Sequence, residues 1–491
     1  MVRLKKFTLW GIVASGLAVT SYLYFSGKFS TPSPDAQRYF SKINVKTETG
    51  DYIPAAQLGN SDYCGHCHRD VFQQWNASAH HFSSFNNPFY RKVALEVEAK
   101  KGNDALKFCA NCHDPLPIAS GEIEDHKSNM WSANAGITCL ACHRITEIHG
   151  PNGQYVLSAP TLHPFAITEN PMLQKFHSAL VNLTPWLHRK ALTQDFYSEP
   201  EFCATCHTLV VPQSLNGVND ITLLNEFGHW KNSRFSGKHS ISGVQQDSKS
   251  CSDCHMPLVE SNDPAAKNGL IKSHRFPGGH TILPTMNRDF TQLKTVEKFL
   301  QDQKVIVSIV GIRIPPQLRY LDPDQVVITK SKAQIELAVR ISNVGVGHTF
   351  PAGTVDSNEA WLEFIALDSN AQVVHHSGGL DDNKEIIEGS HLFKATFVDA
   401  VGNKTDRRNT TTEAVTKAAS SVIESGTSTI VYEMLTIPAN AVFPIELKVK
   451  LNWRKYNPAF VQWVYDGRTV PELPITIIAQ SSIQLKNSSV Q

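Results

Sequence analysis

Ten cysteines carry the most informative chemistry of this 491-residue chain, because all of them fall in five copies of the pattern Cys-x-x-Cys-His. Two thiols at this spacing can each form a thioether bond to a porphyrin vinyl group, and the histidine that follows can bind the iron. The pattern is therefore the attachment signature of c-type haem. Numbered 1 to 5 in chain order, the motifs are Cys64, Cys67 and His68; Cys109, Cys112 and His113; Cys139, Cys142 and His143; Cys203, Cys206 and His207; and Cys251, Cys254 and His255.

Two other chemistries use a single Cys-x-x-Cys pair, namely half of a zinc site and a redox-active dithiol. A zinc site needs four converging ligands, and a dithiol needs no histidine after its second cysteine. Here histidine follows the second cysteine in every copy, and no cysteine is left over for a structural disulfide. The sequence therefore predicts five covalently bound haems c with their iron, and it favours electron transfer as their chemistry.

Length and charge narrow the function further. A chain of 491 residues is long enough for two or three domains. Lys+Arg 46 against Asp+Glu 45 gives a formal net charge of +1, so the composition indicates no nucleic acid partner. All five motifs lie between residues 64 and 255, about 38 residues for each. With so little polypeptide for each cofactor, the haems must form much of the core and lie close together.

The N-terminus predicts export. Basic residues at positions 3, 5 and 6 precede a run without charge from Phe7 to Phe25. Such a run, coiled as a helix, nearly spans a hydrocarbon core of about 30 Å, and the basic flank would stay in the cytoplasm. We expect residues 1–25 to be a signal-anchor helix that holds the protein to the inner membrane on its periplasmic side. A cleaved signal peptide is the alternative.

The remainder of the chain divides by pattern. Residues 26–59 are expected to be a polar tether and residues 60–302 a pentahaem cytochrome c domain of short helices and loops. Helices are expected at 68–80, 90–101 and 288–302. Residues 303–491 contain no cysteine and alternate apolar with polar residues, which predicts β strands. The expected strands lie at 304–310, 335–341, 360–367, 428–434, 445–453 and 474–479.

The fold class expected from these patterns is multidomain. It combines an N-terminal membrane helix, a mostly α or irregular multihaem cytochrome c domain, and a C-terminal all-β sandwich-like domain. Two polar segments of the C-terminal domain could carry chemistry. Asp356 and Glu359 are interpreted as groups that fix a turn rather than as acid and base. Asp406, Arg407 and Arg408 are interpreted as a surface cluster, although guanidinium groups could pair with a haem propionate.

The second axial ligand of each iron decides between electron transfer and catalysis. Sixteen histidines remain after the five motif histidines. Iron held by two histidines is saturated and can only pass electrons, whereas iron that lacks the second ligand can bind and transform a small molecule. The residue counts alone leave open which irons are saturated.

The sequence resembles a group of exported bacterial pentahaem cytochromes, within the multihaem superfamily that includes the nitrifier tetrahaem cytochrome and hydroxylamine oxidoreductase. The resemblance covers residues 60 to 480. It rests on residues 63–70, 74–88, 108–115, 136–143, 185–188, 201–207, 254–257, 273–280, 347–359 and 399–409. It implies distal iron ligands at the matching histidines, which are His80, His188, His239, His274 and His348. Ligation by His348 would close the C-terminal domain over a haem.

We therefore expect a multihaem cytochrome that relays electrons through five mostly bis-histidine haems in the periplasm, with no catalytic residue. Its expected partners are redox proteins, either quinol-linked proteins of the membrane or soluble and outer-membrane electron carriers. One alternative is a haem oxidoreductase in which one five-coordinate haem acts on a small nitrogen or sulfur compound. Another makes the C-terminal domain a docking module for a membrane complex.

Overall fold

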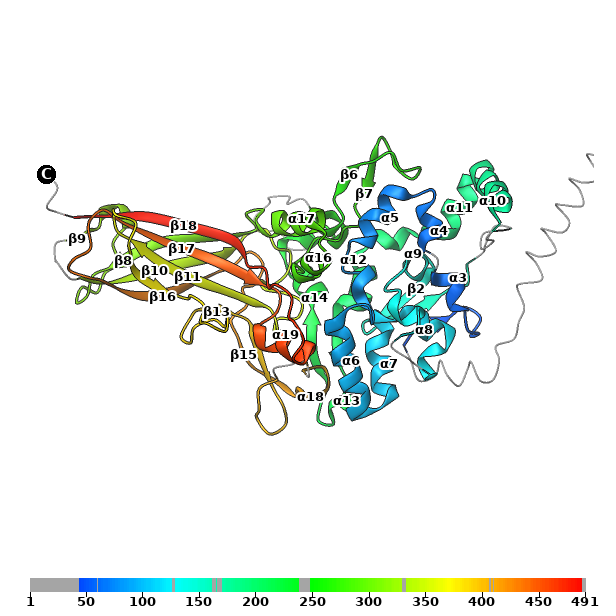
Figure 1. Ribbon diagram of the computed structural model, residues 1–491, viewed down its shortest axis with the longest axis horizontal. Coiled ribbons are helices and arrows are strands. Elements are labelled where there is room, and N and C mark those ends of the chain that lie inside the picture. The colour runs from blue at the N-terminus through cyan, green and yellow to red at the C-terminus, as the bar shows by residue number, and fades with distance from the viewer. Residues whose placement is uncertain are drawn as a thin grey trace, which may run out of the picture.

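A computed structural model of the chain describes residues 44–59, 61–125, 129–160, 165, 170–237, 248–328, 333–405, 408 and 410–487. The molecule is elongated, with a helical part at one end of its long axis and a β part at the other (Figure 1). The helical part ends with the helix at Phe290–Leu300, and the first long strand of the β part begins at Val305.

The helical part is built from short helices with small β units between them. Its helices are α3 (Ala55–Gly59), α4 (Ser61–Gly65), α5 (Arg69–Asn76), α6 (Pro88–Lys101), α7 (Asn103–His113), α8 (Pro115–Ser120), α9 (Cys139–His143), α10 (Pro171–Leu183), α11 (Pro185–Leu192), α12 (Pro200–His207), α13 (Gln213–Asn216), α14 (Glu226–Lys231), α15 (Cys251–His255), α16 (Ile282–Met286) and α17 (Phe290–Leu300). A three-stranded sheet has the order β1 (Lys46–Thr47), β3 (Gln154–Leu157), β2 (Ile145–Gly150). Two hairpins join β4 (Thr208–Val211) to β5 (Ile221–Asn225) and β6 (Leu258–Glu260) to β7 (Leu270–Lys272). Helices this short are not stable alone, so tertiary packing must hold them.

The start of α6 shows how the sequence positions a helix beside the site described below. The Asn87 side chain accepts hydrogen bonds from the backbone N–H groups of Phe89 and Tyr90, and Pro88 fills the first helical position. Both features favour helix initiation at this residue. The helix ends at Gly102, whose φ of 83° suits a residue without a side chain. Phe89 and Tyr90 are therefore fixed in the first turn of α6.

The β part consists of two mainly antiparallel sheets. One has the order β16 (Ser428–Ile437), β10 (Ala333–Asn343), β8 (Val305–Arg313). The other has the order β12 (Val373–Ser377), β11 (Glu359–Leu367), β17 (Ile445–Arg454), β18 (Thr476–Asn487), β9 (Val327–Ile328), and β13 (Leu392–Phe393) pairs with β11. Only the β18–β9 pair of these described ladders is parallel. A separate hairpin joins β14 (Ala395–Val398) to β15 (Thr416–Ser420).

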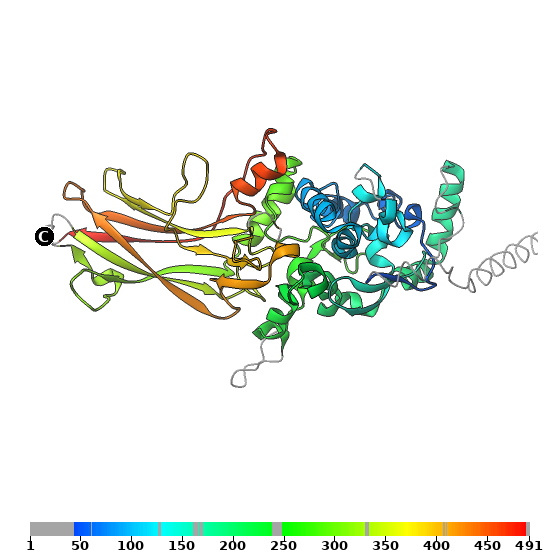
Figure 2. The ribbon, with the colours of Figure 1, turned by 90° about the horizontal axis from the view of Figure 1, so that it is seen from below.

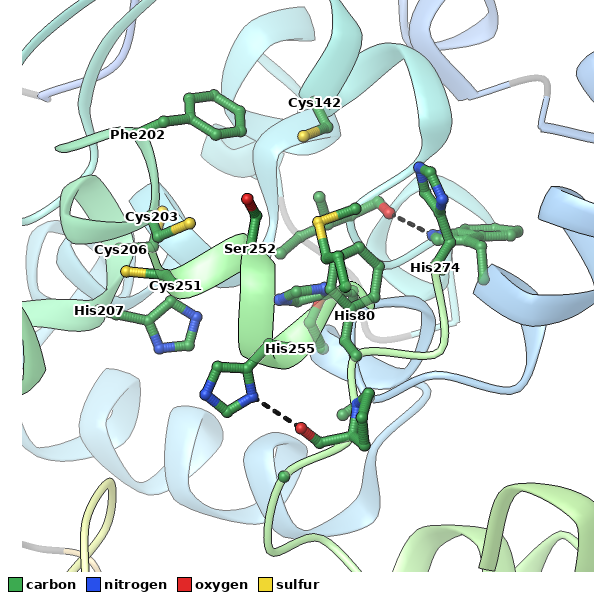
Figure 3. A pocket seen from close by; sticks show the side chains of 18 of the residues that line it. His80, Cys142, Phe202, Cys203, Cys206, His207, Cys251, Ser252, His255 and His274 are labelled. Atoms are coloured by element: carbon green, nitrogen blue, oxygen red, sulfur yellow. Dashed lines mark hydrogen bonds between the residues drawn. The ribbon is translucent and has the colours of Figure 1, made fainter. Parts of the chain in front are cut away.

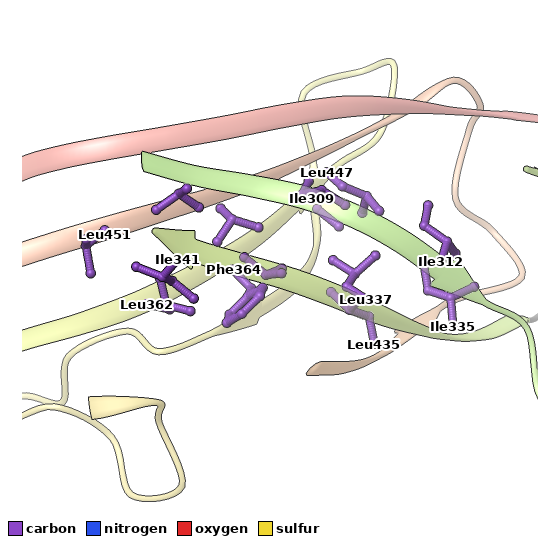
Figure 4. Packing of buried hydrophobic residues seen from close by; sticks show 14 of the residues in the cluster. Ile309, Ile312, Ile335, Leu337, Ile341, Leu362, Phe364, Leu435, Leu447 and Leu451 are labelled. Carbon is purple, nitrogen blue, oxygen red and sulfur yellow. The ribbon is translucent and has the colours of Figure 1, made fainter. Parts of the chain in front are cut away.

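Alternating side chains give the two sheets a shared apolar core. Along β17, Leu447 and Val449 are buried, while Lys448 between them is only half-buried. Figure 4 shows Leu337 of one sheet and Leu447 of the other within the same cluster. Burial of a side chain of this size contributes about 1.5–3 kcal/mol, so the β part holds a core of its own.

The two parts also share contacts. The indole N–H of Trp453, at the end of β17, donates to the carbonyl oxygen of Gly279 at 2.8 Å. Phe89 of α6 packs with Tyr456 and with Phe460 of α19 (Pro458–Tyr465) in one buried cluster. Figure 1 shows α19 beside α6, and α18 (Thr410–Glu413) lies at the same junction. The ends of the β strands therefore deliver side chains to the helical part.

Most expected elements are confirmed, and one segment is corrected. The helices expected at 68–80, 90–101 and 288–302 correspond to α5, α6 and α17, and the six expected strands to β8, β10, β11, β16, β17 and β18. The expected tether is wrong at its C-terminal end, because Val45, Ile53 and Leu58 are buried in the helical core. Strand β1 also pairs with β3. The helical part therefore begins before residue 60.

The expected fold class is wrong in its membrane helix. In the part of the chain that the structure describes, no helix is both long and apolar enough to cross a membrane. Helix α6, for example, has 14 residues and carries several charges, so at 1.5 Å per residue it falls well short of a core of about 30 Å. The segment 1–25, on which the expectation fell, lies outside the described residues.

Candidate haem sites

One cavity of about 1720 Å³ connects all five motifs. It is lined by all ten cysteines and all five motif histidines, with mostly apolar side chains between them. Figure 3 shows a region of it where Cys203 and Cys206 of motif 4 lie beside Cys251 of motif 5, with Cys142 of motif 3 farther away. An apolar space bordered by attachment residues suits flat apolar macrocycles, so the cavity fits several haems.

Local helical structure gives the motifs a common geometry. Helices α9 and α15 consist of the motif itself, and α7 and α12 end on the motif histidine. Residues three and four positions apart lie on one face of a helix, so both cysteines and the histidine project to the same side. The Thr138 hydroxyl caps α9 by accepting from the Ala141 N–H at 3.0 Å, and it donates to the Leu58 carbonyl at 2.6 Å. That pair of bonds fixes the direction in which motif 3 faces.

Four motif histidines are oriented through Nδ1. His113, His143 and His255 donate from Nδ1 to a backbone carbonyl at 2.7–2.8 Å, since a carbonyl can only accept. His68 contacts the buried Asp263 carboxylate at 2.8 Å through the same atom. This leaves Nε2 as the free nitrogen that can bind a metal. The donor set therefore fits iron ligation.

Four motif histidines also face a second histidine from elsewhere in the chain. Two imidazoles that bind one metal from opposite sides, with bonds of about 2.0 Å, have ring centres about 6 Å apart. The ring centres of the four pairs are 6.1–6.3 Å apart. The rings are near parallel in three pairs (6–22°) and near perpendicular in the fourth (72°). The pairs are His68 with His188, His143 with His274, His255 with His348, and His207 with His80.

Burial prepares these histidines for ligation. It lowers the pKa of His80 to about 3, and the pKa values of His255 and His274 to about 4. Imidazole binds metals in its neutral form. The buried rings are therefore already in the binding form at neutral pH.

His113 of motif 2 has different surroundings. Among the described residues no histidine forms such a pair with it, and the Tyr90 ring stacks beside it with centres 4.3 Å apart. The Tyr90 hydroxyl donates to the Asp114 carboxylate. Burial raises the pKa of Asp114 to about 7. Motif 2 is thus the one whose described neighbours supply no second imidazole at ligand distance.

Several polar residues outside the motifs and the five expected distal histidines line the cavity near motif 2. They are His280, Lys455 and Tyr456, together with Arg408, which was interpreted as a surface residue. Arg408 instead pairs with Asp356 inside the junction. Lys455 and Tyr456 directly follow β17, and no local pattern distinguishes them from other residues after a strand. Only the packing of the β part on α6 brings them to the cavity.

The motifs adjoin one another in a series. The Cys64 and Cys139 sulfur atoms lie within hydrogen-bond reach of each other, so motifs 1 and 3 touch. Cys112 with Cys206, and Cys203 with Cys251, connect motifs 2 and 4 and motifs 4 and 5 in the same way. Cys142 and Cys206 interact as well. The order of contact is therefore 1, 3, 4, 5, with motif 2 beside motif 4.

Of the five predicted distal histidines, the structure brings four to a motif histidine, and their role as ligands stays a prediction. His239 lies outside the described residues. Glu359, interpreted as a structural group, is buried against Arg454, with 2.7 Å between its Oε2 and the arginine Nε. Asp356 holds Arg408, so both carboxylates have cationic partners.

Comparisons with known proteins agree with this geometry. Residues 63–144, which contain motifs 1 to 3, match the family cytochrome c554 and c-prime. The structure of a penta-heme cytochrome c552 from Thermochromatium tepidum is similar to 88% of this chain and 100% of its own, with a TM-score of 0.54 and 17% sequence identity. At that identity the likeness shows the fold alone. A β-glucuronidase from glycoside hydrolase family 2 aligns with 38% of this chain and 13% of its own, with a TM-score of 0.17 and 12% identity, and carries no argument.

None of the curated proteins matches the chain. The matched segment and the shared fold support a multihaem c-type cytochrome with covalently bound haem c.

Proposed function

We propose that the protein is a pentahaem cytochrome c that relays electrons, with four irons each held between two histidines. The observation that carries this proposal is the set of four histidine pairs with ring centres 6.1–6.3 Å apart. Each pair joins a motif histidine to one of His188, His274, His80 and His348. Iron in such a site is saturated, so when bound it gains and loses electrons without binding substrate.

The hydrogen-bond partners of the motif histidines should give the haem sites different reduction potentials. A carboxylate on Nδ1 makes an imidazole a stronger donor than a carbonyl does, which favours the oxidised metal. His68 contacts Asp263, whereas His143 and His255 donate to carbonyls. We number each haem site after its motif, and we therefore propose that site 1 has a lower reduction potential than sites 3 and 5. The order of contact between motifs gives electrons a path from site 1 through sites 3 and 4 to site 5.

The haem count and the spin state test this proposal together. Mass spectrometry of protein from a host that attaches haem should show five haems on each chain, and low-temperature electron paramagnetic resonance should show at least four low-spin irons. A mass that matches the bare polypeptide would end the proposal. Fewer than four low-spin irons would refute the histidine pairing.

We also propose that the protein is exported and exchanges electrons with redox proteins in the periplasm. Support comes from the likeness to c-type cytochromes, because covalent attachment of haem takes place outside the bacterial cytoplasm. Haem-stained protein should appear in the periplasmic or envelope fraction. Mature holoprotein in the cytoplasmic fraction would contradict this.

A second candidate function is catalysis at site 2. It is favoured by the surroundings of His113, where the described residues supply a tyrosine beside the ring but no second imidazole at ligand distance. An iron open on one side would bind a small molecule while the other four sites deliver or remove electrons. Carbon monoxide binding to one iron of the reduced protein, with a matching high-spin signal in the oxidised protein, would be the expected result. Five low-spin irons would refute it.

A further inference from the structure

The wall of the cavity near motif 2 contains a half-buried cation, Lys455, that has no carboxylate partner among the described residues. Lys455 Nζ donates to Thr354 Oγ1 and to Asn358 Oδ1, both at 3.0 Å. Within the described part of the chain it forms no ion pair, although Asp356 and Glu226 act on its charge from farther away. Two neutral acceptors use two of its three N–H groups. The third has no hydrogen-bond acceptor among the described residues, although Nζ also lies 5.2 Å from the centre of the Tyr456 ring.

Arg408 and His280 line the same region of the cavity. Arg408 forms an ion pair with Asp356, and its charge acts on both His113 and Lys455. The Nδ1 atom of His280 is buried without a hydrogen-bond partner. Burial keeps the pKa of His280 well below its usual value, so its ring is neutral and has a donor or acceptor to offer. Such unsatisfied polar groups are rare in folded proteins and are typical of functional sites.

A chain of ring contacts places this cluster beside motif 2. The His113 ring stacks on Tyr90, and the neighbouring Phe89 lies 4.6 Å from Tyr456 between ring centres. Tyr456 in turn meets the His280 ring at 5.7 Å and directly follows Lys455. One wall of the region thus comes from α6, and the facing wall comes from the residues after β17.

We propose that Lys455, Arg408 and His280 form a binding site for a small inorganic oxyanion, such as nitrite or sulfite, on the open side of site 2. This inference rests on the five-coordinate site 2 proposed above as the second candidate function. Asp356 compensates the charge of Arg408, which leaves its remaining N–H groups as oriented donors, and Lys455 supplies the uncompensated charge. An anion that accepts from these donors would neutralise the Lys455 cation, whereas neutral hydroxylamine would not.

The experiment uses purified holoprotein and three variants, Lys455→Gln, Arg408→Gln and Lys448→Gln. Lys448 lies on β17, the strand that Lys455 follows, and pairs with Glu446 at 3.4 Å, away from the cavity, so its variant controls for loss of a lysine charge. Sodium nitrite, sodium sulfite and hydroxylamine are titrated against the oxidised protein, and the haem absorbance change is recorded. Carbon monoxide is titrated against the reduced protein as a neutral ligand of the same iron.

The expected result is saturable binding of at least one oxyanion to one haem. Lys455→Gln should weaken it about 10- to 100-fold, because a hydrogen bond to a charged group is lost in a buried site. Arg408→Gln should weaken it about tenfold, and Lys448→Gln should bind as the unaltered protein does. Carbon monoxide affinity should change much less than oxyanion affinity in Lys455→Gln and Arg408→Gln and stay unchanged in Lys448→Gln, which shows that the iron still binds a neutral ligand.

The outcomes separate the two proposals. Carbon monoxide binding without oxyanion binding, or oxyanion binding that Lys455→Gln leaves unchanged, would overturn the anion site and keep the open haem. Absence of carbon monoxide binding with five low-spin irons would overturn the open haem and the anion site with it. A fifth low-spin iron that becomes high-spin in Lys455→Gln would show that Lys455 itself binds the metal, and would also overturn the anion site.

Discussion

Replacement of His348 by glycine tests whether the β part completes a haem site. The His348 and His255 rings lie 6.3 Å apart at an angle of 6°, as two ligands of one iron would. The loop that carries His348 is held partly by its backbone, because the His348 carbonyl accepts from the Asn343 side chain at 2.9 Å. His348→Gly therefore removes the imidazole and leaves that anchor in place.

The size of the effect follows from the number of sites. Loss of one ligand in a protein with five motifs should convert about one fifth of the iron from low to high spin. This increment is the same whatever spin state site 2 contributes. It can be measured by double integration of the low-temperature electron paramagnetic resonance spectrum. Added imidazole should enter the space left by the side chain and restore the low-spin signal.

His391→Ala is the matched control, because His391 also lies in the β part but binds Glu433 at 3.1 Å and does not line the cavity. Its spectrum should equal that of the unaltered protein. An unchanged spectrum for His348→Gly would show that His348 is not a ligand. Equal high-spin gains in both variants would mean that any damage to the β part disturbs the haems, and the reasoning would fail.

Three further predictions concern stability, pH and cofactor removal. Glu359→Gln should destabilise the protein by about 3–5 kcal/mol in chemical denaturation, because Arg454, 1% exposed, would lose its partner; Glu359→Met with Arg454→Met should restore most of the loss. Oxyanion affinity at site 2 should fall above about pH 8, because burial lowers the pKa of Lys455 to about 8 and the cation is lost there. A profile that does not fall above pH 8, or the same fall in Lys455→Gln, would contradict this. The charged and titratable groups that face Lys455 are Arg408, Asp356, Glu226 and His280. His280 is already neutral at this pH, because burial lowers its pKa well below the usual value. Limited proteolysis of chain produced without haem attachment should yield a resistant fragment that begins near residue 303. The β part has its own core, whereas the helical part encloses a cavity of about 1720 Å³. Resistance of the helical part would contradict this.

Local patterns were sufficient for the regular elements. Alternation at 335–341 and 445–453 predicted β10 and β17, since each strand has one face in the core and one outside. The polar composition of residues 26–59 predicted a tether, and this prediction was wrong at the C-terminal end of the segment. A few apolar residues there, such as Val45 and Leu58, are buried. Composition reports the average of a segment, whereas burial depends on which individual side chains find a partner.

The sequence by itself determined covalent haem attachment, because both thiols and the histidine of each motif lie within five residues and one helical turn brings them together. The resemblance to known cytochromes indicated the distal histidines but not their partners. Tertiary structure decided that His80 faces His207 and that His348 faces His255, since each meeting requires the chain to return from a distant segment. It also placed Lys455 and Arg408 beside motif 2, because only the packing of the β part against α6 brings the end of β17 to the cavity.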